Sequence, residues 1–108
     1  MLDPATCSDM TALRANIDAL DRDLVRLLRL RAAHIDRAIE LKRANGWPAR
    51  IPTRVEEVVS KVRAESAACG LDPNLTEDLW RQLIDWSIDR EARVIGTGIA
   101  DVPGKKPA

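Results

Sequence analysis

Residues 9–44 read DMTALRANIDALDRDLVRLLRLRAAHIDRAIELKRA, and this stretch decides the fold. Its apolar residues recur at steps of three and four, the period of an amphipathic helix, and no Gly or Pro interrupts them. These positions are Leu13, Ile17, Leu20, Leu24, Leu27, Leu28, Ile35, Ala38 and Ile39. Ser8 or Asp9 can cap the start, and Asn45-Gly46-Trp47-Pro48 supplies a glycine and a proline that end a helix. The stretch therefore predicts one long helix.

A second helix is expected from a capping box, Thr53-Arg54-Val55-Glu56, in which Thr53 caps the first turn and Glu56 reaches back. Gly70 ends this helix. The segment is rich in β-branched residues, so a strand stays open as an alternative that the capping box and the length disfavour.

A third helix is expected from a similar cap, Asn74 with Glu77, to about Ile95. The chain should therefore be all-α, with three helices and a long first helix. We expect one helical domain over residues 1–96 and a disordered tail over residues 97–108, which are rich in Gly, Pro and Lys.

Composition disfavours several classes of protein. The 108 residues include 17 basic and 17 acidic side chains, whereas a nucleic-acid-binding protein usually shows a basic excess. No apolar run is long enough for a membrane span, and Met1-Leu2-Asp3-Pro4 does not begin a signal peptide. Cys7 and Cys69 are expected to be free thiols in a reducing cytoplasm, and a single His makes a metal site improbable.

The length of the first helix predicts a partner. A helix over residues 9–44 spans roughly 54 Å, whereas a compact domain of this size has a diameter of roughly 35 Å. The apolar stripe continues along the overhang and needs a cover, most simply a second copy of the chain. A helix broken into a hairpin is the alternative, although no breaker stands between Thr11 and Ala44.

Two cations interrupt the apolar stripe of this helix. Arg31 and Lys42 are offset by about 20° around the axis and roughly 16 Å along it. Each could extend to solvent, but two buried cations on one face favour a bound anion. Arg14 lies about 42 Å from Lys42, so only an antiparallel dimer could bring it to the same ligand.

Polar residues also stand on the apolar face of the third helix, which carries Ile84, Ser87, Ile88, Glu91 and Ile95. Glu91 should be paired with a cation or be a neutral acid. A bridge to Arg90 or another surface Arg is the structural alternative. Arg54, in the first turn of the second helix, is either part of an anion site or a solvated residue.

These residues together resemble the all-helical chorismate mutases over roughly residues 8–95. The matching pattern is Leu13-Arg14, Ile17-Asp18, Asp21, Leu24-Val25, Leu28 and Arg31, then Lys42, then Arg54-Val55-Glu56, then Ile84, Ser87 and Glu91. The resemblance implies an intertwined homodimer with shared active sites, in which the first helix crosses to the partner.

The resemblance also implies an activity, the rearrangement of chorismate to prephenate in aromatic amino-acid biosynthesis. Arg14 from the partner subunit and Arg31 would hold the carboxylates of the substrate, and Arg54 would help to anchor it. Lys42 and Glu91 would donate to the ether oxygen, and Ser87 would line the pocket. Such a reaction needs clamped carboxylates and a positive donor, and no metal or cofactor.

Departures from the family pattern leave alternatives open. Ile51 and Val55 stand where some mutases carry carboxylates that contact the ring hydroxyl, and Glu91 stands where many bacterial members have Gln. We expect Glu91 to act in its protonated form. Cys7 shortly before Arg14 resembles the isochorismate-pyruvate lyases, which form salicylate and pyruvate. An aminodeoxychorismate mutase and a non-catalytic helical dimerisation module also remain possible.

Overall fold

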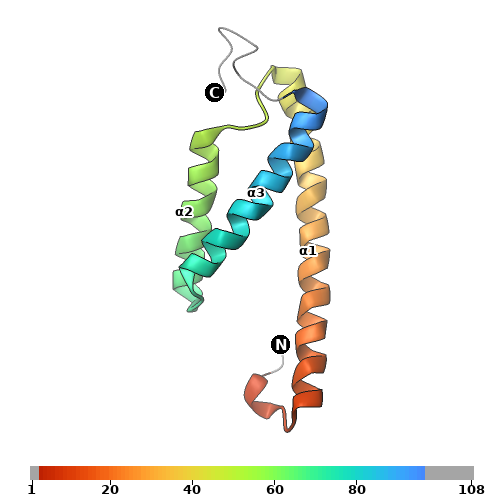
Figure 1. Cartoon of the computed structure of the whole chain (residues 1–108), viewed down its shortest axis with the longest axis vertical. Coiled ribbons are helices and arrows are strands. Elements are labelled where there is room, and N and C mark those ends of the chain that lie inside the picture. The colour runs from red at the N-terminus through yellow and green to blue at the C-terminus, as the bar shows by residue number, and fades with distance from the viewer. Residues whose placement is uncertain (1–2, 97–108) are drawn as a thin grey trace. The chain divides into compact units, whose positions relative to one another are not determined.

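The computed structural model describes residues 3–96, and the predicted tail over residues 97–108 lies outside them. A short 3-10 helix, η1 (Pro4–Thr6), precedes three α-helices: α1 (Met10–Asn45), α2 (Pro52–Cys69) and α3 (Pro73–Ile95) (Figure 1). Residues 3–96 contain no strand, so the all-α prediction is confirmed and the strand alternative for the second segment is wrong. The hairpin alternative is also wrong, because α1 is continuous over 36 residues.

The chain divides into two compact units, Met1–His34 and Ile35–Ala108, with the boundary inside α1. The first unit contains η1 and the N-terminal part of α1. The second contains the last turns of α1, the following loop, α2 and α3. The single domain over residues 1–96 stays a prediction.

Local hydrogen bonds shape the start of the first unit. The Asp3 carboxylate accepts from the backbone N–H of Ala5 at 2.9 Å and caps η1. The Asp9 carboxylate accepts from the backbone N–H of Ala12 at 2.8 Å, so Asp9 is the cap expected for the long helix. Both cysteines are free thiols, as expected.

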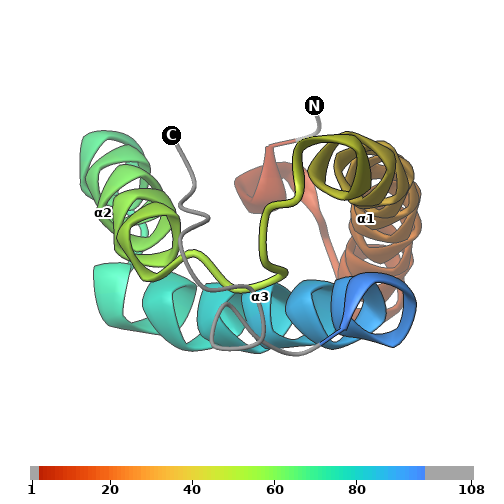
Figure 2. The ribbon, with the colours of Figure 1, turned by 90° about the horizontal axis from the view of Figure 1, so that it is seen from above.

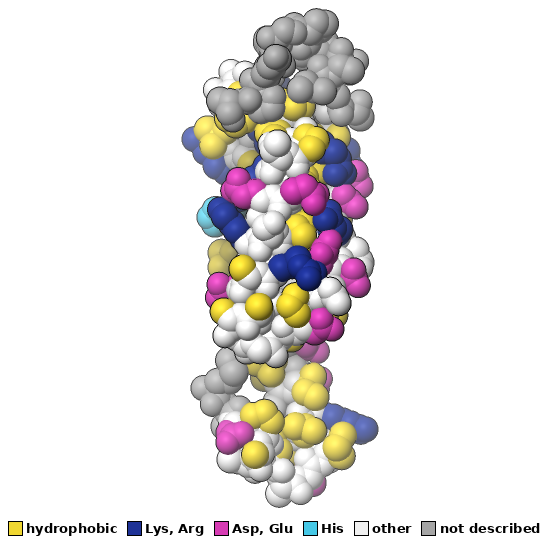
Figure 3. All heavy atoms as spheres, turned by 90° about the vertical axis from the view of Figure 1, so that its left-hand side faces the viewer, with side chains coloured by type: hydrophobic (Ala, Val, Ile, Leu, Met, Phe, Trp, Pro, Cys, Tyr) yellow, Lys and Arg dark blue, Asp and Glu magenta, His cyan; other side chains and the backbone are white. Residues whose placement is uncertain are grey.

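No large apolar side chain among residues 3–34 is buried. The large apolar residues that are exposed in this range are Met10, Ile17, Leu20, Leu24, Val25, Leu27, Leu28 and Leu30. Hydrophobic side chains are visible on the surface of this N-terminal segment in the space-filling view (Figure 3). Contiguous apolar surface of this kind marks an interaction site in a folded protein.

The starts of α2 and α3 differ from the predicted caps. Proline is the first residue of each helix, where its fixed φ favours the first turn and its missing N–H costs nothing. Pro52 therefore starts α2 after Ile51, which has no side-chain cap, and the predicted capping box at Thr53 is wrong. In α3 the Asp72 carboxylate caps by accepting from the N–H of Asn74 at 2.9 Å, so the predicted Asn74 cap is wrong as well.

An apolar cluster joins α2 to α3 in the second unit, where the two helices are in contact and diverge at an angle from the turn that connects them (Figure 1, Figure 2). Its buried members are Ala49, Val59, Ile84 and Ile88, and Val55, Val58, Trp80, Ala92 and Ile95 pack against them. Burying one such aliphatic side chain contributes about 1.5–3 kcal/mol. These residues come from α2, α3 and the loop before α2, so among the described residues α1 adds nothing to the cluster.

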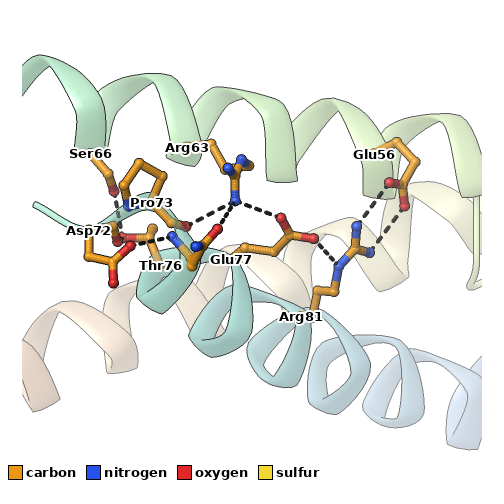
Figure 4. A network of polar contacts seen from close by, with 9 residues as sticks. Glu56, Arg63, Ser66, Asp72, Pro73, Thr76, Glu77 and Arg81 are labelled. Atoms are coloured by element: carbon orange, nitrogen blue, oxygen red, sulfur yellow. Dashed lines mark hydrogen bonds and ion pairs between the residues drawn. The ribbon is translucent and has the colours of Figure 1, made fainter.

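A polar network also joins α2 to α3 (Figure 4). Arg81 donates to both oxygens of Glu56, at 3.0 and 3.2 Å, and to Glu77 Oε2 at 2.8 Å. Arg63 donates to Glu77 Oε1 at 2.9 Å and to the Asn74 side-chain oxygen at 3.1 Å. The hydrogen bonds from Arg81 lower the pKa of Glu56 and of Glu77. Glu56 and Glu77, expected in capping boxes, therefore bind arginines instead.

None of the helices within residues 3–96 combines the length and the hydropathy that a membrane span requires.

Candidate active site

Lys42 and Glu91 form an ion pair in the second unit. Lys42 Nζ lies 3.0 Å from Glu91 Oε1, and the side chains are only 17% and 4% exposed. Lys42 Nζ also donates to the backbone carbonyl of the buried Ala49 at 2.8 Å. The sequence predicted that Glu91 would either pair with a cation or be a neutral acid, and the structure shows a pair. The cation is Lys42, whereas Arg90 binds Asp36.

The chain path near the end of α1 positions Lys42. This residue stands in the last turn of the helix, where a cation is favoured by the helix dipole. Gly46 has a φ of +71°, a left-handed conformation that reverses the chain after the helix. The backbone N–H of Trp47 then donates to the carbonyl of Lys42 at 2.9 Å. The reversal brings the Ala49 carbonyl to the ammonium group of Lys42.

Ser87 and Glu91 share the buried face of α3, as their spacing predicts. Ser87 is 3% exposed, and its hydroxyl donates to the Leu83 carbonyl at 2.8 Å. Ser87 therefore lies one turn before Glu91 on the same face of the helix.

A second ion pair joins α1 to α3. Arg90 Nε lies 2.6 Å from Asp36 Oδ1, and Arg90 Nη2 lies 3.1 Å from Asp36 Oδ2. The guanidinium carbon of Arg90 also lies 5.5 Å from the ring centre of Trp86. The hydrogen bond with Arg90 lowers the pKa of Asp36 and raises that of Arg90. Asp36 was not predicted from the sequence, because the spacing of residues along one helix does not indicate a partner 54 residues away.

The remaining predicted site residues are not gathered around this pair within the second unit. Arg54 is exposed and pairs with Glu57 at 2.6 Å. Arg14 and Arg31 belong to the first unit. Arg14 is exposed, and Arg31 is half-buried. One unit therefore brings together Lys42, Glu91 and Ser87.

Within residues 3–96, no cluster of three or more His, Cys, Asp or Glu side chains could hold a metal ion.

Comparison with known proteins identifies the family. Residues 13–92 match the family model described as chorismate mutase type II. The matched range contains Lys42, Ser87 and Glu91. The chain belongs to the chorismate mutase type II family. The homologues that belong to this family are isomerases.

Individual relatives agree with this membership in the type II family. The chain is 33% identical over 84 residues to the T-protein of Enterobacter agglomerans, covering 78% of this chain and 22% of that protein. It is 30% identical over 79 residues to the T-protein of Haemophilus influenzae, covering 73% and 21% of the two chains. The chain thus spans about a fifth of the length of these T-proteins.

A third relative of this type II chain is a 4-amino-4-deoxychorismate mutase from Streptomyces pristinaespiralis. The two are 33% identical over 101 residues, which cover 93% of this chain and 78% of the relative. No solved structure matches the chain.

Proposed function

We propose that this protein is a chorismate mutase that converts chorismate to prephenate. The observation that carries the proposal is the buried Lys42–Glu91 pair, because family resemblance assigns both residues to the ether oxygen of the substrate. A hydrogen-bond donor at that oxygen stabilises the transition state, since negative charge develops there as the C–O bond breaks. The C–C bond forms in the same step, so the reaction needs no nucleophile and no second reactant.

The resting ion pair sets a condition for catalysis. With Glu91 ionised, its carboxylate accepts from Lys42 and has no proton for the substrate. The Glu91 carboxyl can donate to the ether oxygen only in its protonated form, because a carboxylate accepts hydrogen bonds and donates none. We therefore propose that Lys42 turns from Glu91 to the ether oxygen, while protonated Glu91 becomes the second donor.

A second copy of the chain would complete the site. Large apolar residues and Arg14 are exposed in the first unit, and a second copy of the chain could contact both. We propose a homodimer in which these apolar residues are covered and Arg14 of the partner subunit joins Arg31 at the substrate carboxylates. Arg54 is expected to leave its exposed contact with Glu57 to reach the same anion. The cytoplasmic location stays a prediction.

The substrate assay tests the proposal. The purified chain should form prephenate from chorismate, and Lys42→Gln should lower kcat by about 10²–10³-fold, the usual loss for one donor. Arg43→Gln is the matched control, because Arg43 is an exposed cation in the same last turn of α1. No prephenate from the folded wild type would reject the proposal.

A second candidate function is a 4-amino-4-deoxychorismate mutase. The relative with that name matches 93% of this chain. Ile51 and Val55 are apolar, and Val55 packs against the core cluster, so neither can accept a hydrogen bond from a ring hydroxyl. A site that hydrogen-bonds the ring hydroxyl rejects a substrate in which that hydroxyl is missing. Without this hydrogen bond, a mutase can accept such a substrate.

A parallel assay separates the candidates. Chorismate, 4-amino-4-deoxychorismate and isochorismate are supplied separately, and kcat/KM is compared. Release of salicylate and pyruvate from isochorismate would instead identify a lyase. A folded dimer inactive with all three would indicate a helical dimerisation module.

A further inference from the structure

The last turns of α1 make two ion pairs with α3 in the second unit. The apolar cluster of the second unit contains no residue of α1, and within the described part of α1 only Ile39 is buried. Two ion pairs join this part of α1 to α3, Asp36–Arg90 and Lys42–Glu91. Polar side chains therefore contribute to the position of the end of α1 relative to α3.

The Asp36–Arg90 pair has the geometry of a positioning contact. Two guanidinium nitrogens of Arg90 donate to the two oxygens of Asp36, at 2.6 and 3.1 Å, so the pair is bidentate. The packing of Arg90 against Trp86 adds a second restraint on the guanidinium plane. Two parallel hydrogen bonds fix direction as well as distance, which a single contact of a lysine cannot do.

The two ion pairs are mechanically linked, because they lie on the same two helices. Arg90 directly precedes Glu91 on α3, and Asp36 lies about 9 Å before Lys42 along α1. A slip of α1 by one residue would move it by about 1.5 Å and turn it by about 100°. Any such slip that breaks the Asp36–Arg90 pair also displaces Lys42 from Glu91.

We propose that Asp36 and Arg90 are positioning residues that hold Lys42 against Glu91 in the catalytic arrangement. The catalytic part of this inference rests on the proposed function. The side chains are 47% and 42% exposed, and half-exposed ion pairs contribute little to stability. Loss of the pair should therefore impair positioning more than folding.

The test uses two variants of the full chain with a matched control. Asp36→Asn removes the charge of the acceptor, and Arg90→Lys keeps the charge but removes the planar fork. Glu40→Gln is the control, because it breaks the exposed Arg37–Glu40 pair on the same helix, at 2.8 Å. Misplacement of a catalytic group by about 1 Å can cost 10²-fold in rate. We expect kcat to fall at least tenfold in both variants, with KM and Tm nearly unchanged and the control at the wild-type rate.

A second measurement needs no turnover. In nitrogen-15 NMR of the substrate-free protein, the Lys42 ammonium should give a slowly exchanging signal, because it donates to Glu91 and to Ala49. The signal should be lost or shifted in Asp36→Asn and Arg90→Lys, and retained in Glu40→Gln. Unchanged Lys42 signals in both variants, or a kcat that falls only as the folded fraction falls, would overturn the inference. A wild type without mutase activity but with the expected NMR changes would reject the proposed function alone.

Discussion

Lys42 Nζ and Glu91 Oε1 lie 3.0 Å apart, although Lys42 belongs to α1 and Glu91 belongs to α3. Both are anomalous in their helices, because each puts a charge on an apolar face. The ion pair explains how either charge can be buried, since each neutralises the other. It also makes the two residues interdependent in stability, in protonation and in catalysis.

Removing Lys42 should destabilise the protein. Lys42→Ala leaves the Glu91 carboxylate buried without its cation, and breaking a buried pair in this way costs about 3–5 kcal/mol of the free energy of unfolding. The double variant Lys42→Ala/Glu91→Gln should be more stable than Lys42→Ala, because no charge is then left unpaired. Urea titration of the two single variants and the double variant measures this coupling. Additive changes would mean that the pair contributes no coupling energy.

Shared active sites predict complementation between inactive variants. Arg14→Ala and Lys42→Gln should each be inactive as homodimers. A mixture that has exchanged subunits should regain about one-quarter of the wild-type activity, because half the dimers are mixed and each has one intact site. Activity is followed after mild denaturation and refolding of the two together. Failure to regain activity, with mixed dimers present, would place Arg14 in its own chain's site.

The network between α2 and α3 predicts loss of stability in acid. Hydrogen bonds from Arg81 lower the pKa of Glu56 and Glu77 below the ordinary 4.5. Carboxyls with a lowered native pKa stabilise the fold fully above pH 4.5, and this contribution is lost as pH falls through their native pKa. Arg81→Gln should flatten the acid dependence of Tm below pH 4.5. Arg50→Gln, which breaks the exposed Arg50–Asp85 pair, should change it less.

Some features of the fold and the site could be predicted from local sequence, and others could not. Helical spacing predicted the three helices, and charges on apolar faces singled out Lys42 and Glu91. The starts of α2 and α3 were misplaced because the proline at each first position outweighs the capping-box pattern. The Asp36–Arg90 pair was missed because it depends on how α1 and α3 pack, and spacing along one helix carries no information about that.

The most direct test of the central claim is the rate at which the purified chain converts chorismate to prephenate, measured beside Lys42→Gln. We expect rapid formation of prephenate by the wild type and a loss of about 10²–10³-fold in kcat for Lys42→Gln. A folded wild type that forms no prephenate, or a Lys42→Gln variant with the wild-type rate, would contradict it.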